Sequence, residues 1–408
     1  MTPTDASGPL SGTRVVELGI WVAAPSGTAM LADWGADVVK VEAPAGDPLR
    51  QIRHAVHLDD DQPCPYFDPE NRGKRSVVLD LRSVGGREVL AALLEDADVL
   101  VTNLRPAALA RLGLDHETVL ERYPSLVYAL VTGYGTEGPD AAAGAYDMGA
   151  YWARGGVAHL LTTPGGPVPT QRSGMGDHLT GLGVAGMVSA ALLERARTGR
   201  GQLVTTSLLR MAAWQVSTDY NVRLMVDREP PRTDRRDEDS PVWNSYTAGD
   251  GKGFWLIGVE ADRHWPTLVR IVGRQDWAED PTLATRAGRS ARRGELIAEL
   301  DRIFATRPRR DWAALFDAEP DFFWAPVNDV DDVLADPQTH AAGVVTHVGR
   351  PGGAVPMGDG PIDFHGVPAP TRRPAPRLGE HTDEGLADLT RRGRLRPSTT
   401  TAPIGATP

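Results

Sequence analysis

The sequence contains a single cysteine, Cys64. One cysteine cannot form a disulfide framework or a metal site built from several thiolates, so both are excluded. The histidines are scattered, and none lies in a His-x-x-x-His pattern or in a motif that joins glutamate to two histidines. Metal-dependent catalysis is therefore disfavoured, and we expect no metal ion as a cofactor.

Long hydrophobic runs and positive net charge are missing as well. No signal-peptide h-region opens the sequence, and the alanine- and glycine-rich run after Asp177 is too short and too weakly hydrophobic for a membrane span. The net charge of −11 disfavours a general surface for nucleic acids or anionic membranes, although local basic clusters could hold a small anion. We expect a soluble, cytoplasmic protein without nucleic-acid or membrane partners.

Familiar nucleotide-binding and catalytic motifs are also absent. No G-x-G-x-x-G follows the first predicted strand, and there is neither a Walker A loop nor a G-x-S-x-G nucleophile elbow. A nicotinamide-dependent enzyme is therefore disfavoured, and we expect no NAD.

Residues 14–132 show a repeated strand–helix–strand pattern. Strands are predicted over Arg14–Leu18, Asp37–Glu42, Ser76–Leu81, Val99–Val101 and Leu126–Thr132, with helices over Pro25–Trp34, Gly86–Asp96, Ala107–Leu112 and His116–Tyr123. Right-handed crossovers between such strands build a parallel sheet. The pattern predicts an α/β fold with a doubly wound domain.

The composition changes sharply later in the chain. A strand is predicted over Gln202–Thr206 and a helix over Ser207–Met225, and residues 227–240 form a polar, mixed-charge run typical of a linker. A smaller unit follows, with a strand over Phe254–Val259 and several helices. The last residues, 396–408, are of low complexity and are predicted to be disordered.

The most informative stretch is Gly174-Met-Gly-Asp177-His178, followed by an apolar run to Leu193. The glycines allow a sharp turn and leave room for a ligand, and the run predicts a buried helix that ends at Gly199. Asp177 would lie where the loop enters this helix, and the nearby N–H groups and helix dipole would keep its carboxylate ionised. The alternative is that Asp177 only caps the helix.

Basic side chains lie beside several predicted strand ends. They are Arg72, Lys74 and Arg75 before one strand, Arg82 after it, and Asn103, Arg105 and Arg111 after another. Ligands of open α/β sheets bind at the carboxyl ends of the strands, where arginine and lysine can bind phosphates. Each cluster could equally be a solvated, ion-paired face.

Aromatic residues offer a second set of candidates. Tyr146 and Asp147 could border a site, or could be a packed ring and a helix cap. The tryptophans Trp21, Trp152 and Trp214 could line an apolar acyl pocket together with Tyr151, or could fill the core.

Taken in order, these segments resemble the family III CoA-transferases, a group that includes formyl-CoA transferase, carnitine CoA-transferase and α-methylacyl-CoA racemase. The resemblance covers nearly the whole chain. It rests on residues Leu10–Leu18, Leu31–Glu42, Asn71–Leu81, Ala97–Pro106, Gly174–Asp177, Arg197–Gln202, Ala325–Asp329, Ala335–Gln338 and Pro376–Thr382.

The resemblance implies roles for particular residues. Asp177 matches the family's nucleophile, and contacts to coenzyme A would come from Val22, Ala23, Leu79, Arg82, Asn103, Leu104, Arg105, Arg111, Tyr146 and Asp147. It further implies a homodimer of interlocked subunits. Each subunit would have a large Rossmann-like CoA-binding domain formed by residues 1–226 and 333–395, a linker at 227–240 and a small α/β domain at 241–332.

Two departures from the family bear on the substrate. Ala43 stands where formyl-CoA transferase has an arginine for coenzyme A, so another cation must serve. The glycine-rich flap over the nucleophile has no counterpart, and the charged 227–240 run occupies that region. We therefore expect an apolar or aromatic acyl group rather than exchange between oxalate and formate.

The resemblance implies acyl-CoA:carboxylate CoA transfer, with acyl-CoA and a carboxylic acid as partners. One alternative is an α-methylacyl-CoA racemase, whose Gly-His-Asp motif corresponds here to Ala145-Tyr146-Asp147. A tyrosine titrates near ~10 and is a poor base at neutral pH. Another alternative is a CoA-binding protein without catalysis, which the glycine setting of Asp177 argues against.

Overall fold

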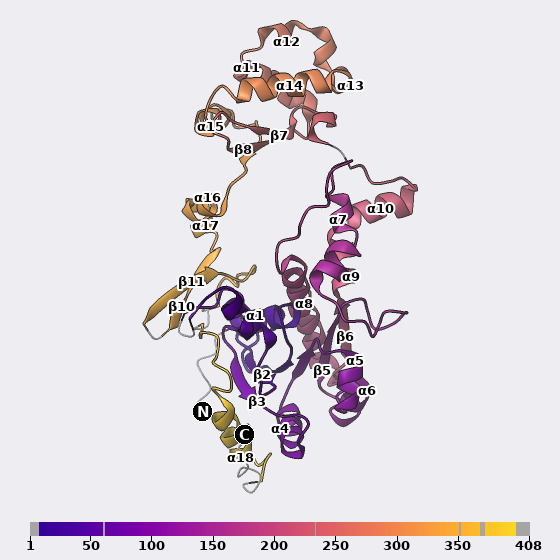
Figure 1. Ribbon diagram of the computed structural model, residues 1–408, viewed down its shortest axis with the longest axis vertical. Coiled ribbons are helices and arrows are strands. Elements are labelled where there is room, and N and C mark those ends of the chain that lie inside the picture. Colours follow the sequence, from indigo (N-terminus) through magenta and orange to yellow (C-terminus); the bar gives the residue numbers. More distant parts are fainter. Residues whose placement is uncertain (1–7, 60–61, 233, 351, 368–371, 397–408) are drawn as a thin grey trace. The chain divides into compact units, whose positions relative to one another are not determined.

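The computed structural model describes residues 8–59, 62–232, 234–350, 352–367 and 372–396. The chain divides into two units, shown in Figure 1. The larger unit comprises Met1–Leu160, Val168–Pro230 and Gly343–Pro408, and the smaller one comprises Leu161–Pro167 and Pro231–Ala342. Both ends of the chain thus contribute to the larger unit. The predicted disordered tail lies outside the described residues, except for Arg396.

A parallel sheet forms the centre of the larger unit, as the sequence predicted. Its six strands in the described residues have the order β3-β2-β1-β4-β5-β6. Because the order reverses between β1 and β4, the loops after these neighbouring strands diverge and leave a crevice in which ligands of such sheets bind. The strands are β1 (Arg14–Leu18), β2 (Asp37–Glu42), β3 (Arg75–Val78), β4 (Val99–Thr102), β5 (Val127–Thr132) and β6 (Leu203–Ser207).

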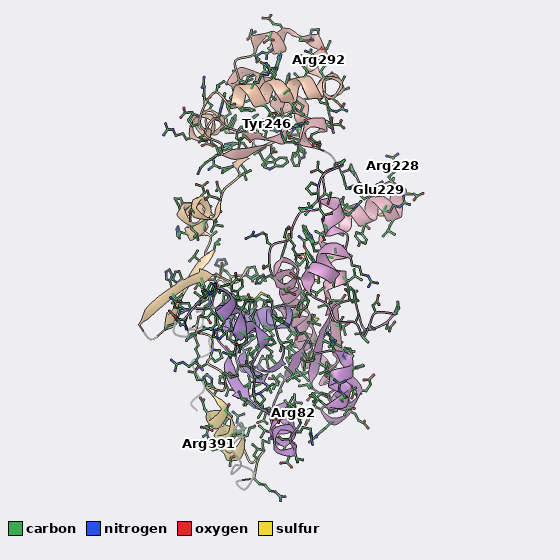
Figure 2. The ribbon with its side chains drawn as sticks, viewed as in Figure 1. Arg82, Arg228, Glu229, Tyr246, Arg292 and Arg391 are labelled. Carbon is green, nitrogen blue, oxygen red and sulfur yellow. The ribbon has the colours of Figure 1, made fainter. Side chains whose placement is uncertain are left out.

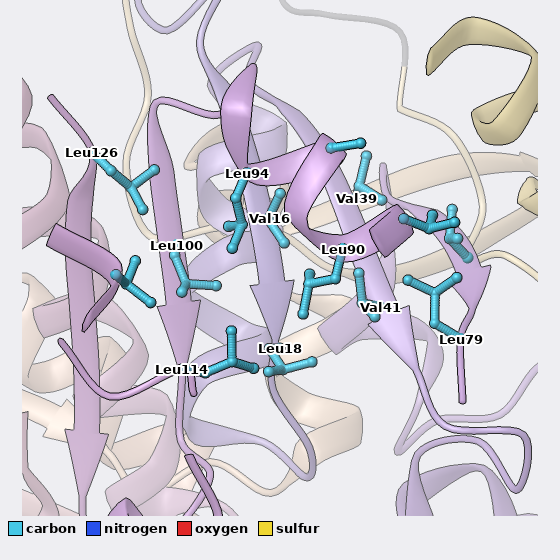
Figure 3. Packing of buried hydrophobic residues seen from close by; sticks show 14 of the residues in the cluster. Val16, Leu18, Val39, Val41, Leu79, Leu90, Leu94, Leu100, Leu114 and Leu126 are labelled. Carbon is cyan, nitrogen blue, oxygen red and sulfur yellow. The ribbon is translucent and has the colours of Figure 1, made fainter. Parts of the chain in front are cut away.

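Helices cover both faces of the sheet. Successive side chains of a strand point to opposite faces, so Val15 and Val16 of β1 belong to different cores. Val16 packs with Leu90 of α4 and Leu100 of β4 in the core shown in Figure 3. Helices α4 (Val84–Glu95), α5 (Pro106–Arg111), α6 (His116–Arg122) and α18 (Thr382–Arg391) bury residues in this core. Val15 packs in the other core, which is covered by α1 (Ala23–Asp33) and α8 (Met175–Thr198).

Glycines allow α1 and α8 to touch directly. A Cβ atom added to Gly27 of α1 would lie 2.6 Å from the Cβ atom of Val184, and one added to Gly181 of α8 would lie 2.9 Å from the backbone nitrogen of Gly27. Larger side chains at these glycines would push the helices apart. This contact fixes the start of α8 relative to the loop that precedes α1.

Helix α8 is longer than the sequence analysis allowed. It spans 24 residues and contains an 18-residue window with a mean hydropathy of 1.2, enough by length and composition alone to cross a membrane. The prediction that this run is too short to span was therefore wrong. In the structure, Val184, Ala185 and Val188 of α8 pack in the core beside the sheet. Such packing is typical of the central helix of an α/β protein.

The other elements of the larger unit lie in its loops and its C-terminal part. The predicted helix over Ser207–Met225 is divided at Val216 into α9 and α10. These elements are η1 (Pro48–Gln51), α2 (Ile52–Ala55), α3 (Asp68–Asn71), the π-helical turn η2 (Met148–Ala153), α7 (Val157–Leu160), α9 (Leu208–Gln215), α10 (Ser217–Val226), β10 (Val345–Arg350) and β11 (Gly353–Gly358).

The smaller unit has its own core, in which aromatic rings such as Phe254, Phe304 and Trp312 pack together. An antiparallel sheet joins its three strands in the order β7-β8-β9. Its elements are η3 (Arg235–Asp237), β7 (Trp243–Thr247), β8 (Gly253–Ile257), α11 (Ala261–Ile271), α12 (Gln275–Glu279), η4 (Pro281–Ala284), α13 (Arg286–Ala291), α14 (Arg293–Phe304), α15 (Arg309–Asp317), β9 (Trp324–Pro326), α16 (Val330–Ala335) and α17 (Pro337–Ala341).

Candidate active site at the carboxyl edge of the sheet

The loops after β1 and β4 are joined by Asn103. Its Oδ1 accepts a hydrogen bond from the backbone N–H of Ile20 at 2.9 Å, and its Nδ2 donates to the Ile20 carbonyl at 2.7 Å. The next residue, Trp21, has a φ of 63°, which is rare for a side chain of this size. Asp47 accepts a hydrogen bond from the Trp21 N–H at 3.1 Å. Side chains from two other loops therefore hold this loop in an uncommon conformation at the crevice between β1 and β4.

A buried ion network lies beneath the same loop. Lys40 pairs with Glu17 at 2.6 Å and with Asp47 at 2.9 Å, and Lys74 pairs with Glu17 at 2.6 Å. All four side chains are fully buried. Lys40 also donates a hydrogen bond to the Gly19 carbonyl. Because buried charges require such partners, this network ties the loop after β1 to two other strands.

The network also corrects the reading of the first basic cluster. Lys74 and its neighbours Arg72 and Arg75 were considered as phosphate ligands or as a solvated face, but all three are buried. Arg72 pairs with Asp33 and Arg75 with Asp37. Burial lowers the pKa of Lys74 to about 8, against the opposing attraction of Glu17. These residues support the sheet and α1.

Asp177 is the third residue of α8, so its interpretation as the N-cap was wrong. The N-cap is Gly174, with a left-handed φ of 74° and no capping side chain. A Cβ atom on Gly174 would lie 3.9 Å from the Cγ1 atom of Val22, and one on Gly176 would overlap the ring of Tyr151. Gly174 is therefore favoured by its left-handed φ, and Gly176 is needed for α8 to begin this close to the Tyr151 ring.

The carboxyl group of Asp177 is poorly solvated. Burial, with help from the nearby charges of Asp147 and Glu70, raises its pKa to about 7, and only His178 acts in the opposite direction. Within the described ranges, no donor forms a hydrogen bond with this carboxylate. The expectation that the helix start keeps Asp177 fully ionised was therefore wrong. A desolvated carboxylate of this kind is more basic and thus a stronger nucleophile.

Glu70 and His178 form a pair beside Asp177 that the sequence analysis missed. The Nε2 atom of His178 lies 2.8 Å from Oε1 of Glu70, which comes from α3 and is buried, whereas the His178 side chain is 57% exposed. The hydrogen bond to Glu70 is the main reason that the pKa of His178 lies above its ordinary value. The only signal in the sequence was the position of His178 directly after Asp177.

Tyr146 and Asp147 lie on the approach to this region. The Tyr146 ring meets the Trp21 ring edge to face, with centroids 5.7 Å apart, and Tyr146 is largely exposed. Asp147 accepts hydrogen bonds from the N–H of Met148 at 2.7 Å and from Nε2 of Gln171 at 2.9 Å. The capping alternative therefore holds for Asp147, whose charge also acts on Asp177.

The remaining predicted CoA contacts are more widely spread. Ala23 is buried at the first turn of α1, and Leu104 packs at the edge of the core around Val16. Leu79 is fully buried in that core, so its side chain has no surface to offer a ligand. Arg82 precedes α4 and is labelled in Figure 2; its guanidinium group is paired with Asp80 at 2.9 Å.

Arg105 and Arg111 stand at the two ends of α5. Both are exposed, and neither forms an ion pair within the described part of the chain. The side chain of Arg105 packs over Gly144, two residues before Tyr146. Arg105 thus contacts the loop that carries Tyr146, and among the described residues no hydrogen bond or ion pair joins Arg111 to that loop. The departure at Ala43 lies on an exposed turn just after β2.

The aromatic acyl-pocket residues do not gather in one place. Tyr151 and Trp152 are buried and fill a small core with Leu208 and Ala212. Trp214 is 72% exposed on α9. Of the predicted set, Trp21 lies in the loop after β1, and the buried Tyr151 ring packs against Gly176, next to Asp177. Among the described residues, no group of three or more histidine, cysteine or acidic side chains is arranged to hold a metal ion.

Comparison of the chain with known proteins identifies its relatives. The sequence model of CoA-transferase family III matches residues 10–382. The chain is 30% identical to (R)-2-hydroxy-4-methylpentanoate CoA-transferase of Clostridioides difficile, covering 93% of this chain and 95% of that protein. It is 31% identical to cinnamoyl-CoA:phenyllactate CoA-transferase of Clostridium sporogenes, covering 93% of each.

Solved structures give the same result. A CaiB/BaiF family protein from Brucella suis superposes with a TM-score of 0.83 at 32% identity, covering 94% of this chain and all of that one. The match to the family extends over the sheet, the loops at its carboxyl edge and Asp177. The chain belongs to CoA-transferase family III.

Proposed function

We propose that this protein transfers coenzyme A between an acyl-CoA donor and a carboxylic acid through covalent intermediates on Asp177. The observation that carries the proposal is the setting of this carboxylate. It is poorly solvated and, among the described residues, has no hydrogen-bond donor at the first turn of α8. The strand order predicts a ligand crevice between β1 and β4 of the same unit. Membership of the family supports CoA transfer in general.

The chemistry requires only a positioned carboxylate. Asp177 attacks the thioester carbonyl of the donor, and the C–S bond breaks to give a mixed anhydride and CoA thiolate. The thiolate attacks the Asp177 carbonyl, which releases the donor acid and leaves an aspartyl-CoA thioester. The acceptor carboxylate then displaces the thiolate to form a second anhydride. Attack by the thiolate on the acceptor's carbonyl gives the new acyl-CoA and regenerates Asp177.

The start of α8 can stabilise the negative oxygen that forms in each of these steps. The first N–H groups of a helix have no partner within the helix. The N–H of Met175 is already used by the Arg172 carbonyl, which leaves those of Gly176 and Asp177 for the reacting oxygen.

Coenzyme A would be held along the carboxyl edge of the sheet. Arg105 and Arg111 are exposed cations suited to its phosphates. The resemblance to the family implies that Val22, Ala23, Asn103, Leu104, Tyr146 and Asp147 contact the rest of the coenzyme A molecule. Two assignments are weaker: Arg82 would have to leave Asp80, and Leu79 could contribute only through its backbone.

The substrate is proposed to be an apolar or aromatic acid. Met175 and Met148 are exposed next to Asp177 and Asp147, and Tyr146 and Trp21 provide aromatic surface on the same approach. Relatives named for 4-methylpentanoate and phenyllactate derivatives support this class. Turnover confined to formate and oxalate would overturn it.

We also propose that two copies associate. In the described part of the chain, Trp214, Leu224, Met225 and Val226 of α9 and α10 are each more than half exposed. Apolar patches of this kind mark interfaces, and the interlocked dimer of the family would cover them. A folded monomer in sedimentation at nanomolar concentration would refute this assembly.

The function is tested by incubating the protein with a panel of acyl-CoA donors and carboxylic acids, and analysing both thioester pools by mass. Hydroxylamine added with acyl-CoA alone should trap one carboxyl group as a hydroxamate. Peptide mapping should place that group at Asp177. Thioester exchange with no modification at Asp177 would contradict the proposed intermediate.

A further inference from the structure

The surroundings of Asp177 carry an excess of negative charge. Asp147 and Glu70 both act on its carboxylate, and neither pairs with an arginine or lysine among the described residues. In the described part of the chain, His178 is the one residue acting on Asp177 that can carry positive charge. The acceptor acid must bring one more carboxylate into this region. The negative charges of Glu70 and Asp147 repel this incoming carboxylate, and the repulsion energy grows as water is excluded from the site.

His178 is held in place on one side and open on the other. Its Nε2 atom is bound to Glu70 at 2.8 Å, and its ring covers Gly174, where a Cβ atom would lie 3.0 Å from Cε1. The buried Glu70 carboxylate favours the protonated imidazole. The exposed half of the ring leaves that charge accessible to a ligand beside Asp177.

On the basis of the proposed transfer through Asp177, we propose a role for His178. The positive charge of its ring, which is held by Glu70, attracts the acceptor's carboxylate to the aspartyl-CoA thioester. The acceptor oxygen attacks the Asp177 carbonyl carbon, the C–S bond breaks, and the negative charge leaves on the CoA thiolate. His178 keeps its proton throughout, so its contribution is electrostatic.

The role of His178 is confined to the steps in which a free carboxylate attacks or leaves the Asp177 carbonyl. The donor thioester enters without a carboxylate at its reacting carbon, so its attack by Asp177 does not need this cation. The second half begins with an anionic acid approaching Glu70 and Asp147. Loss of the positive charge should therefore raise the KM for the acceptor and spare the KM for the donor.

The test uses His178→Gln in the full-length protein, because glutamine can still bond Glu70 but carries no charge. The reaction is transfer from cinnamoyl-CoA to phenyllactate, or the pair with the highest turnover in the acid panel. We expect the acceptor KM to rise about tenfold or more, as for loss of a charge-assisted contact. The donor KM and hydroxylamine trapping at Asp177 from donor alone should change less than threefold.

His159→Gln is the matched control. His159 lies in α7, its side chain is also 57% exposed, and its acidic neighbour Glu229 is 3.7 Å away. It should leave both KM values unchanged. In the wild type, the acceptor KM should also rise with pH as His178 loses its proton. The charge of Glu70 sets this titration, because Asp177 is a neutral thioester when the acceptor binds. That rise should be absent in His178→Gln.

The outcomes separate this inference from the proposed function. An unchanged acceptor KM in His178→Gln, with Asp177 still trapped, overturns the role of His178 and leaves the covalent mechanism standing. Equal loss of trapping and transfer in a folded His178→Gln protein also contradicts the inference, because that result would mean that His178 is needed for the attack on the donor as well as for the reaction with the acceptor. Failure to trap Asp177 in the wild type refutes the proposed function itself.

Discussion

Replacing Asp177 with asparagine should stabilise the protein at alkaline pH. The folded state raises the pKa of this carboxyl from 3.8 to about 7, chiefly through burial. The folded protein therefore binds this proton more tightly than the unfolded chain does. The stability of the wild type must then fall as pH rises from about 4 to about 7, and the ionised group remains destabilising above that range. Asparagine keeps the shape of the side chain and cannot ionise.

The size of the effect follows from the shift. About three pKa units correspond to at most ~4 kcal/mol between the two protonation states. Asp177 is only partly buried, so solvent screens its charge, and we expect about 1–3 kcal/mol. Urea unfolding of Asp177→Asn and wild type at one protein concentration, at pH 5 and at pH 8.5, measures it as a change in relative stability between the two pH values.

A control variant separates the surroundings of Asp177 from its helix position. Asp219 is also the third residue of its helix, α10, in the same unit, and it is half-buried as Asp177 is. Asp219→Asn reports what losing a carboxylate at this helix position does by itself. If Asp177→Asn is destabilising at pH 8.5, or if its effect does not depend on pH, the account of a desolvated carboxylate is wrong.

Four further outcomes are expected. The kcat/KM for the acyl-CoA donor should rise with pH through about 7, because the ionised Asp177 is the form that attacks the donor thioester; a flat donor profile from pH 5 to 9 would contradict this. Lys74→Met leaves a negative charge unpaired in the buried network and should cost about 3–5 kcal/mol in urea unfolding, and a loss below ~1 kcal/mol would show the network to be dispensable. Gly176→Ala should lower stability by about 1–3 kcal/mol through overlap with Tyr151, whereas Gly186→Ala, with open space in the same helix, should be neutral or stabilising; similar values would refute the close approach. Alanine in place of both Arg105 and Arg111 should weaken CoA binding by calorimetry without changing the urea midpoint, and unchanged binding would remove the phosphate assignment.

The central sheet was predictable because its signals are local. Val15, Val16 and Leu18 and Val38, Val39 and Val41 are buried on both faces of the sheet, so both stretches are mainly apolar although Glu17 and Lys40 interrupt them. The strand–helix alternation then predicts a parallel sheet. The position of Asp177 at a helix start followed from the glycines that precede it. The helix over Ser207–Met225 was predicted as one piece because the break at Val216 involves neither glycine nor proline.

The electrostatics of the site could not be predicted, because they depend on residues distant in sequence. Glu70 pairs with His178 from more than a hundred positions away in the sequence, and the charge of Asp147, on a different loop, helps to raise the pKa of Asp177. Lys74 resembled an exposed phosphate ligand because nothing local reveals its pairing with Glu17. The burial of Tyr151 and Trp152 likewise follows from packing against α9, which the sequence pattern did not specify.

The central claim is that Asp177 is the nucleophile, and Asp177→Asn tests it most directly in the transfer assay. Asparagine preserves size and polarity, and the variant's fold is checked by its urea midpoint. We predict that CoA binding remains, that hydroxylamine trapping disappears, and that transfer falls to background in freshly prepared protein verified by mass to be free of deamidation. Full transfer activity in that verified Asp177→Asn protein would contradict the account.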